Sequence, residues 1–203
     1  NYEKYRGGQR MITDTGTRTE FDTGAVRDIK QGKGRCDLMP IDVISNVLSE
    51  RYPAASSVLS MLGEFVDTGD ISKLYGCIDT FISDVQGVDV VDSLLDLSHH
   101  FEEGAIKYGE HNWEKGIPAH SYVDSAIRHL LKVCRGDTDE SHERAFIWNI
   151  SCLIWTVTHK PELVDLAYIE EAADVSEPPT LAPLFESVGS DQTCVDTSST
   201  TTA

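Results

Sequence analysis

The chain has 203 residues, of which 40% are hydrophobic, and a formal net charge of -17 at pH 7. This length and hydrophobic content suffice for one domain with a sizeable core, flanked by tails. The acidic balance argues against nucleic acid and anionic membranes as partners, because generic affinity for both comes from clustered Lys and Arg. An anionic ligand would need local help, either from a divalent cation held by carboxylates or from a few concentrated basic side chains.

Five scattered cysteines, without a C-x-x-C pair, are typical of reduced thiols in a cytoplasm. We see no N-terminal export signal and no apolar run of the ~20 residues that a membrane span requires. We therefore expect a cytoplasmic protein that makes no membrane contact.

The two ends of the chain differ in composition from its middle. Residues 1–20 are polar and rich in Thr, Gly and Arg, which predicts a flexible arm. Residues 176–203 are acidic and rich in Ser and Thr, which predicts a disordered tail. Between them we expect one helical domain over residues 21–175.

The domain begins with FDTGAVRDIKQGKGRCDLMP, residues 21–40, which we interpret as an irregular basic loop. Its Arg27, Lys33 and Arg35 stand among glycines in an otherwise acidic chain. Such cations suit phosphate oxygens, and glycines allow close backbone approach. The P-loop pattern is missing, however, and glycine spacing of this kind is more often an ordinary exposed loop.

Two helical segments follow, at residues 41–66 and 71–84, with apolar residues at three- and four-residue intervals. Pro53 is expected to kink or break the first of them. Residues 41–90 carry no site signature, so this stretch is either a helical hairpin packed on the core or an insertion that serves assembly.

Residues 90–108 form an amphipathic pattern. Its apolar side is predicted to carry Val91, Leu94 and Leu95, and its wet side His99 and His100. Next come a loop, residues 107–118, and a helix at residues 121–135 that ends at a glycine. The loop holds Asn112 and Trp113, which suit a purine by edge recognition and stacking, although Trp113 can equally plug one end of the bundle.

The last helix, at residues 139–159, is apolar almost all round and should be central and buried. His142, Asn149 and Thr156 form one polar stripe along it, and such a stripe needs partners. Glu140 and His142 in its first turn, with Glu102 from across the bundle, are able to hold Mg²⁺ or Mn²⁺. A solvated acidic face and dipole-compensating acidic residues explain the same spacing. No region alternates like a strand, so we predict an all-α fold, a bundle of four to six helices.

Three pieces of the chain, in this order, resemble the phage dATP/dGTP diphosphohydrolase family, MazZ-like relatives of the MazG-type all-α NTP pyrophosphohydrolases. They are FDTGAVRDIKQGKGRCDLMP, HFEEGAIKYGEHNWEKGIP and SYVDSAIRHLLKVCRGDTDESHERAFIWN. The resemblance covers roughly residues 21–40 and 90–159. It departs from the MazG pattern of E-x-x-E and E-x-x-D, since this chain has adjacent Glu102 and Glu103 and a Glu140-x-His142 pair.

The resemblance implies site residues of three kinds. Catalytic roles fall to Glu102, Glu103 and Glu140, and the metal ligands would be Glu102, Asp124, Glu140 and His142. The nucleotide pocket and triphosphate site would comprise Arg27, Lys33, Arg35, Lys107, Asn112, Trp113, Arg128, His129 and Asn149.

The implied reaction is Mg²⁺- or Mn²⁺-dependent hydrolysis of dATP or dGTP to a monophosphate and pyrophosphate, which would shift a phage's purine pool toward 2-aminoadenine in the host cytoplasm. A homodimer or homotetramer is also implied. One alternative is a protein that binds and sequesters a nucleotide or nucleotide signal without turnover. An HD-type phosphohydrolase would need a His-Asp dyad, which neither Arg128-His129 nor His142-Glu143 supplies.

Overall fold

A computed structural model describes residues 16–29 and 31–166 of the chain. The predicted tail and residues 1–15 of the predicted arm lie outside this range. Six α-helices dominate the described part: α1 (Ile41–Leu48), α2 (Pro53–Thr68), α3 (Ile71–Thr80), α4 (Val90–Tyr108), α5 (Ala119–Arg135) and α6 (His142–His159). They confirm the predicted all-α bundle.

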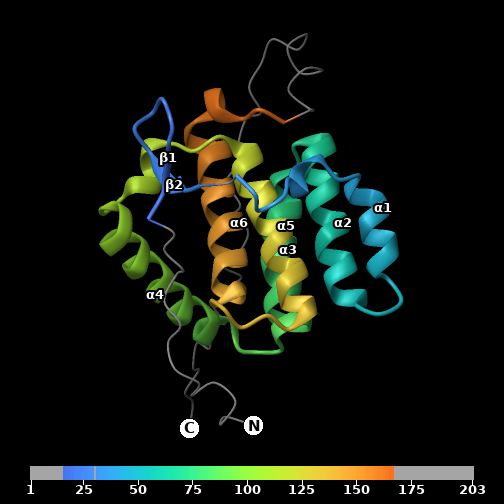
Figure 1. Cartoon of the computed structure of the whole chain (residues 1–203). Coiled ribbons are helices and arrows are strands. Elements are labelled where there is room, and N and C mark those ends of the chain that lie inside the picture. Colours follow the sequence, from blue (N-terminus) through green and yellow to red (C-terminus); the bar gives the residue numbers. More distant parts are fainter. Residues whose placement is uncertain (1–15, 30, 167–203) are drawn as a thin grey trace, which may run out of the picture. The chain divides into compact units, whose positions relative to one another are not determined.

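Helix α6 is the centre of the bundle, with α4 on one side and α5 on the other (Figure 1). Its Phe146, Ile147, Ile150 and Leu153 are buried, as the apolar pattern predicted. Phe146 stacks on Phe81, which follows α3, with ring centroids 4.2 Å apart. The apolar surface that α6 removes from water therefore joins both halves of the bundle into one core.

Pro53 breaks the first predicted helical segment into two helices. It occupies the first turn of α2, where its missing N–H costs no hydrogen bond. At the other end of α2, Gly69 adopts a left-handed φ of 72° and its N–H binds the Phe65 carbonyl. Asp70 then caps α3 by accepting from the Ser72 N–H. A six-residue π-helical turn, η3 (Phe81–Gln86), ends this half of the fold.

A short antiparallel hairpin precedes the helices, and sequence analysis did not predict it. Strand β1 (Arg18–Glu20) pairs with β2 (Val26–Asp28). In the turn between them, the Phe21 N–H donates to the Ala25 carbonyl at 2.9 Å and the Gly24 N–H donates to the Phe21 carbonyl at 2.8 Å, with Gly24 at φ 78°. Three residues per strand are too few to show alternation, which is why the pattern escaped notice.

The orientation of α4 corrects the predicted one. Val91, Leu94 and Leu95, assigned to the packed side, are 58%, 49% and 63% exposed. His100, assigned to the wet side, is only 8% exposed and lies beside Trp148 of α6. Periodicity shows that a helix has two unlike faces, but which face packs depends on its neighbours. Phe101 and Ala105, which follow the same apolar pattern, do face inward and line a cavity together with His100.

None of the helices described is both long and apolar enough to cross a lipid bilayer.

Candidate functional site

A cavity of about 620 Å³ is lined by residues of β2, α4, α5, α6 and the loops that follow β2, α4 and α5. This volume lies within the range of pockets that bury small-molecule ligands, ~300–1,000 Å³. Its wall combines aromatic rings, basic side chains and a group of imidazole and carboxylate side chains.

Arg27 of β2 supplies the positive charge at the inner wall of this cavity. Its guanidinium donates to the Ser121 carbonyl at 3.2 Å, to the Ser125 hydroxyl at 3.2 Å and to Asn149 Oδ1 at 2.9 Å. It also lies over the rings of Tyr122 and Trp148. All three acceptors are neutral, so the charge is not cancelled by a carboxylate, and burial lowers the pKa of Arg27.

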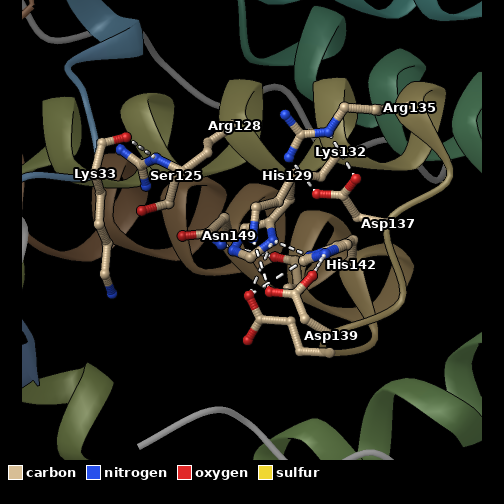
Figure 2. A network of polar contacts seen from close by, with 12 residues as sticks. Lys33, Ser125, Arg128, His129, Lys132, Arg135, Asp137, Asp139, His142 and Asn149 are labelled. Atoms are coloured by element: carbon tan, nitrogen blue, oxygen red, sulfur yellow. Dashed lines mark hydrogen bonds and ion pairs between the residues drawn. The ribbon is translucent and has the colours of Figure 1, made fainter. Parts of the chain in front are cut away.

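The basic loop is anchored on α5 by a buried ion pair between Asp124 and Arg128. Asp124 accepts from the Cys36 N–H at 2.7 Å, while Arg128 donates to the carbonyls of Lys33 and Gly34, both at 3.3 Å. These bonds fix the loop backbone and leave the Lys33 amine pointing away from Arg128 (Figure 2). Burial lowers the pKa of Lys33, which lines the cavity. Through Lys33, the loop thus presents a cation to the cavity.

Asn112 and Lys107 hold β2 in place from the other side. Asn112 Oδ1 accepts from the Val26 N–H at 2.9 Å, and its Nδ2 donates to the Val26 carbonyl at 2.8 Å. Lys107 forms an ion pair with Asp28 at 2.8 Å. Both ends of the Asn112 amide are therefore engaged with the strand that carries Arg27. The structure gives Asn112 and Lys107 positioning contacts, and Asn112 also lines the cavity.

Aromatic side chains form the wall beside α4. Phe101 contacts Trp113 edge-on, with ring centroids 5.8 Å apart, and Trp148 in a tilted arrangement at 6.3 Å. Tyr108 completes this part of the lining. Edge-on and tilted rings expose faces on which a planar base can stack.

A cluster of His129, Glu140 and His142 lies where α5 meets the start of α6. The two Nδ1 atoms are 3.0 Å apart, and Glu140 Oε1 is 3.8 Å from His129 Nδ1 and 3.5 Å from His142 Nδ1. Asp139 Oδ1 lies 2.8 Å from His142 Nε2 on the far side of that ring (Figure 2). This arrangement can hold a metal ion.

The electrostatics of the cluster favour a neutral His129 ring. Burial, and then the neighbouring His142, lowers the pKa of His129 well below its usual value. The hydrogen bond from Lys132 is the main cause of a lowered pKa at Asp139, with the His142 contact adding to it. A neutral ring facing carboxylates is the form of histidine that binds metals.

The structure brings some predicted site residues together and separates others. Those lining the cavity are Arg27, Lys33, Glu102, Asn112, Trp113, Arg128, His129, Glu140 and Asn149. Glu103 instead pairs with Arg144 at 3.3 Å, and Arg35 with Asp37. The Glu102 side chain is 70% exposed at the cavity edge, and Asp124 is committed to its ion pair, whereas Glu140 and His142 are adjacent.

Several lining residues were missed by the sequence analysis. Phe101 and Trp148 were placed in apolar faces, and Ser125 and Asp28 carried no motif of their own. Asp139 offered one usable signal, because it precedes His142 by three residues in an acidic turn. The remaining contacts join segments too distant in sequence for spacing to reveal.

Comparison with known families gives one match. Residues 84–166 match the family model described as dATP/dGTP diphosphohydrolase, N-terminal. This segment, less than half of the chain, is similar to that family. It spans α4, α5 and α6 and so contains most of the cavity lining, whereas Arg27 and Lys33 lie before it. No curated protein and no solved structure was found to match the chain.

Proposed function

We propose that the chain hydrolyses the purine deoxynucleoside triphosphates dATP and dGTP to a monophosphate and pyrophosphate, with the help of a divalent metal ion. The observation that carries this proposal is the cavity, which combines an aromatic wall, an arginine (Arg27) whose described hydrogen-bond acceptors are all neutral, and an imidazole–carboxylate cluster. The similarity of residues 84–166 to a family named for dATP/dGTP diphosphohydrolase supports it. The expected setting is the purine pool of a phage-infected cell that favours 2-aminoadenine.

Each part of the wall then has a task. The base stacks on the rings of Trp113 and Phe101, while Arg27 and Lys33 bind phosphate oxygens. Charge-assisted hydrogen bonds of this kind are the strong ones, contributing about 1.5–3 kcal/mol each. Because Arg27 is held by neutral groups, its charge is available to the triphosphate.

The chemistry requires one water molecule to attack the α-phosphorus while the bond to the bridging oxygen breaks and pyrophosphate leaves. The water proton passes to a carboxylate, for which Glu102 at the cavity edge is our candidate. Glu140 packs against two imidazole rings and is better placed to hold the metal ion. A bound divalent ion would neutralise charge on the phosphates.

The test is product analysis of the purified chain with each dNTP, with Mg²⁺ or Mn²⁺ and with chelator. Glu102→Gln and Glu140→Gln should each lower kcat by two orders of magnitude or more. Loss of a general acid or base typically lowers the rate by about 10²–10⁴-fold. Glu162→Gln, on an exposed turn, is the matched control. Products other than a monophosphate and pyrophosphate would refute the assigned reaction.

A protein that sequesters a nucleotide is the second candidate. The contact of Arg27 with two aromatic rings favours sequestration, because nucleotide binding requires aromatic rings and cations but no metal-binding carboxylates. Nucleotide binding that persists in chelator, without any product, would establish this alternative in place of hydrolysis.

We also propose that the chain forms a homo-oligomer through α4. Its Val91, Leu94, Leu95 and Ile106 are all about half exposed or more, although they are large and apolar. Exposed large apolar side chains such as those gathered at the start of α4 are typical of a protein contact. Light scattering should report a dimer or tetramer that Leu95→Glu converts to monomer, and a monomeric wild-type chain would contradict the proposal.

A further inference from the structure

The separations in the His129–Glu140–His142 cluster match those between ligands that share one metal ion. For metal–ligand bonds of about 2.1 Å, neighbouring ligand atoms are about 3.0 Å apart at 90° and about 3.4 Å apart in a tetrahedron. The three separations here are 3.0, 3.5 and 3.8 Å. An adjustment of a few tenths of an ångström at Glu140 would place all three atoms around one ion.

Asp139 prepares His142 for this role. It accepts a hydrogen bond from Nε2 at 2.8 Å, so the proton of the neutral ring is on Nε2 and the lone pair of Nδ1 faces His129 and Glu140. A carboxylate behind a ligating histidine is the usual way in which proteins fix the tautomer and orientation of the ring. His142 itself is 1% exposed, so the ring is also held by packing.

A second grouping, Asp137, Asp139 and His142, is less suited to a metal ion. Asp137 is bound to Arg135, and Asp139 is bound to Lys132 at 3.0 Å, so both carboxylates already have cationic partners. Glu140, in contrast, has its described close contacts with the two imidazole rings, and Lys33 interacts with it without forming a described ion pair.

We propose that His129, Glu140 and His142 bind one transition-metal ion, of the class of Mn²⁺, Co²⁺ or Zn²⁺, in preference to Mg²⁺. Two nitrogen donors account for the preference, because Mg²⁺ selects oxygen ligands and imidazole suits the transition metals. His129 and Glu140 also line the cavity, so an ion bound by them would lie at its wall, within reach of a ligand in the cavity. The role of this metal ion in hydrolysis rests on the proposed function, but metal binding itself can be measured without turnover.

The experiment uses the full chain, stripped with chelator, and follows Co²⁺ binding by visible absorption and by calorimetry. We expect one Co²⁺ per chain, displaced by Zn²⁺ and unaffected by a hundredfold excess of Mg²⁺. His129→Asn and Glu140→Gln, which alter partly exposed side chains, should weaken binding by on the order of 100-fold or more. Asp139→Asn should weaken it about tenfold, within the ~10–100-fold range for groups behind a ligand.

His159→Asn and Glu162→Gln are the matched controls, since both residues are exposed at the far end of α6 and just beyond it. Circular dichroism of each variant establishes that the fold is retained. Equal Co²⁺ affinity in His129→Asn and the wild type, or displacement of Co²⁺ by Mg²⁺, would overturn the inference. Co²⁺ binding as expected but without hydrolysis of any dNTP would refute the proposed function and leave the metal site standing.

Discussion

Replacing Arg27 with methionine should separate its contribution to stability from its contribution to binding. Methionine removes three hydrogen bonds to neutral acceptors, each contributing about 1 kcal/mol. It also removes a partly buried charge that has no carboxylate partner, and the desolvation cost of such a charge is several kcal/mol. The two effects offset each other, so we expect the free energy of unfolding to change by less than about 1.5 kcal/mol.

Nucleotide affinity should respond very differently. The lost charge-assisted bonds to phosphate contribute about 1.5–3 kcal/mol each, which corresponds to a decrease of about 10–100-fold in affinity per bond. Urea unfolding measures the first quantity, and calorimetry with the non-hydrolysable α,β-methylene analogue of dATP measures the second.

Arg51→Met is the control for the Arg27 variant. Arg51 also lies over a tyrosine ring, that of Tyr52, but is exposed and distant from the cavity lining. It should change neither quantity appreciably. If Arg27→Met lost more than about 3 kcal/mol of stability while keeping wild-type affinity, Arg27 would be a structural residue and the reasoning above would be wrong.

Three further predictions concern the scaffold. Gly116→Ala should lower the free energy of unfolding by about 2–3 kcal/mol, because φ is 112° and a Cβ would clash with Leu163 Cδ1. Gly104→Ala should raise it by about 0.5–1 kcal/mol, because the added Cβ meets no atom within 4 Å. Urea titrations compare the two variants. Asn112→Ala frees the β2 backbone, so nucleotide affinity should fall at least tenfold by calorimetry, and unchanged affinity would contradict this. Burial lowers the pKa of His100 to about 3, so between about pH 6.5 and 4.5 only the unfolded chain binds a proton at this residue. The free energy of unfolding should therefore fall by about 2 kcal/mol over this range. The fall should be less steep in His100→Asn.

The helices could be predicted from the sequence because each is governed by local pattern. The spacing of apolar residues at three to four positions predicted where α4 begins and ends, and Pro53 predicted the break before α2. The buried character of α6, with His142, Asn149 and Thr156 at 1%, 2% and 0% exposure, also followed from composition along one helix. These are properties of short segments, for which side-chain spacing and backbone chemistry suffice.

The site could be predicted only in part because it is assembled from segments far apart in the chain. His129 was expected to contact nucleotide, yet it lies beside His142, thirteen residues later, across the turn between α5 and α6. Arg27 meets Asn149 across 122 residues. Spacing within a helix cannot reveal such neighbours. The exposure of Val91, Leu94 and Leu95 and the burial of His100 on α4 have the same origin, since the packing partners of this helix are other elements.

The polar stripe of α6 explains how the fold and the proposed site depend on each other. Two of its members are satisfied by residues outside the helix: Asn149 by Arg27, and His142 by Asp139 and its neighbours. A buried polar group without a partner costs about 1–3 kcal/mol, so the docking of β2 and of the turn before α6 is favoured by the same contacts that shape the cavity. Arg27, through Asn149, and the imidazole cluster, through His142, are therefore both held against the same helix, α6. That shared support is what a site needs to hold a triphosphate and a metal ion in register.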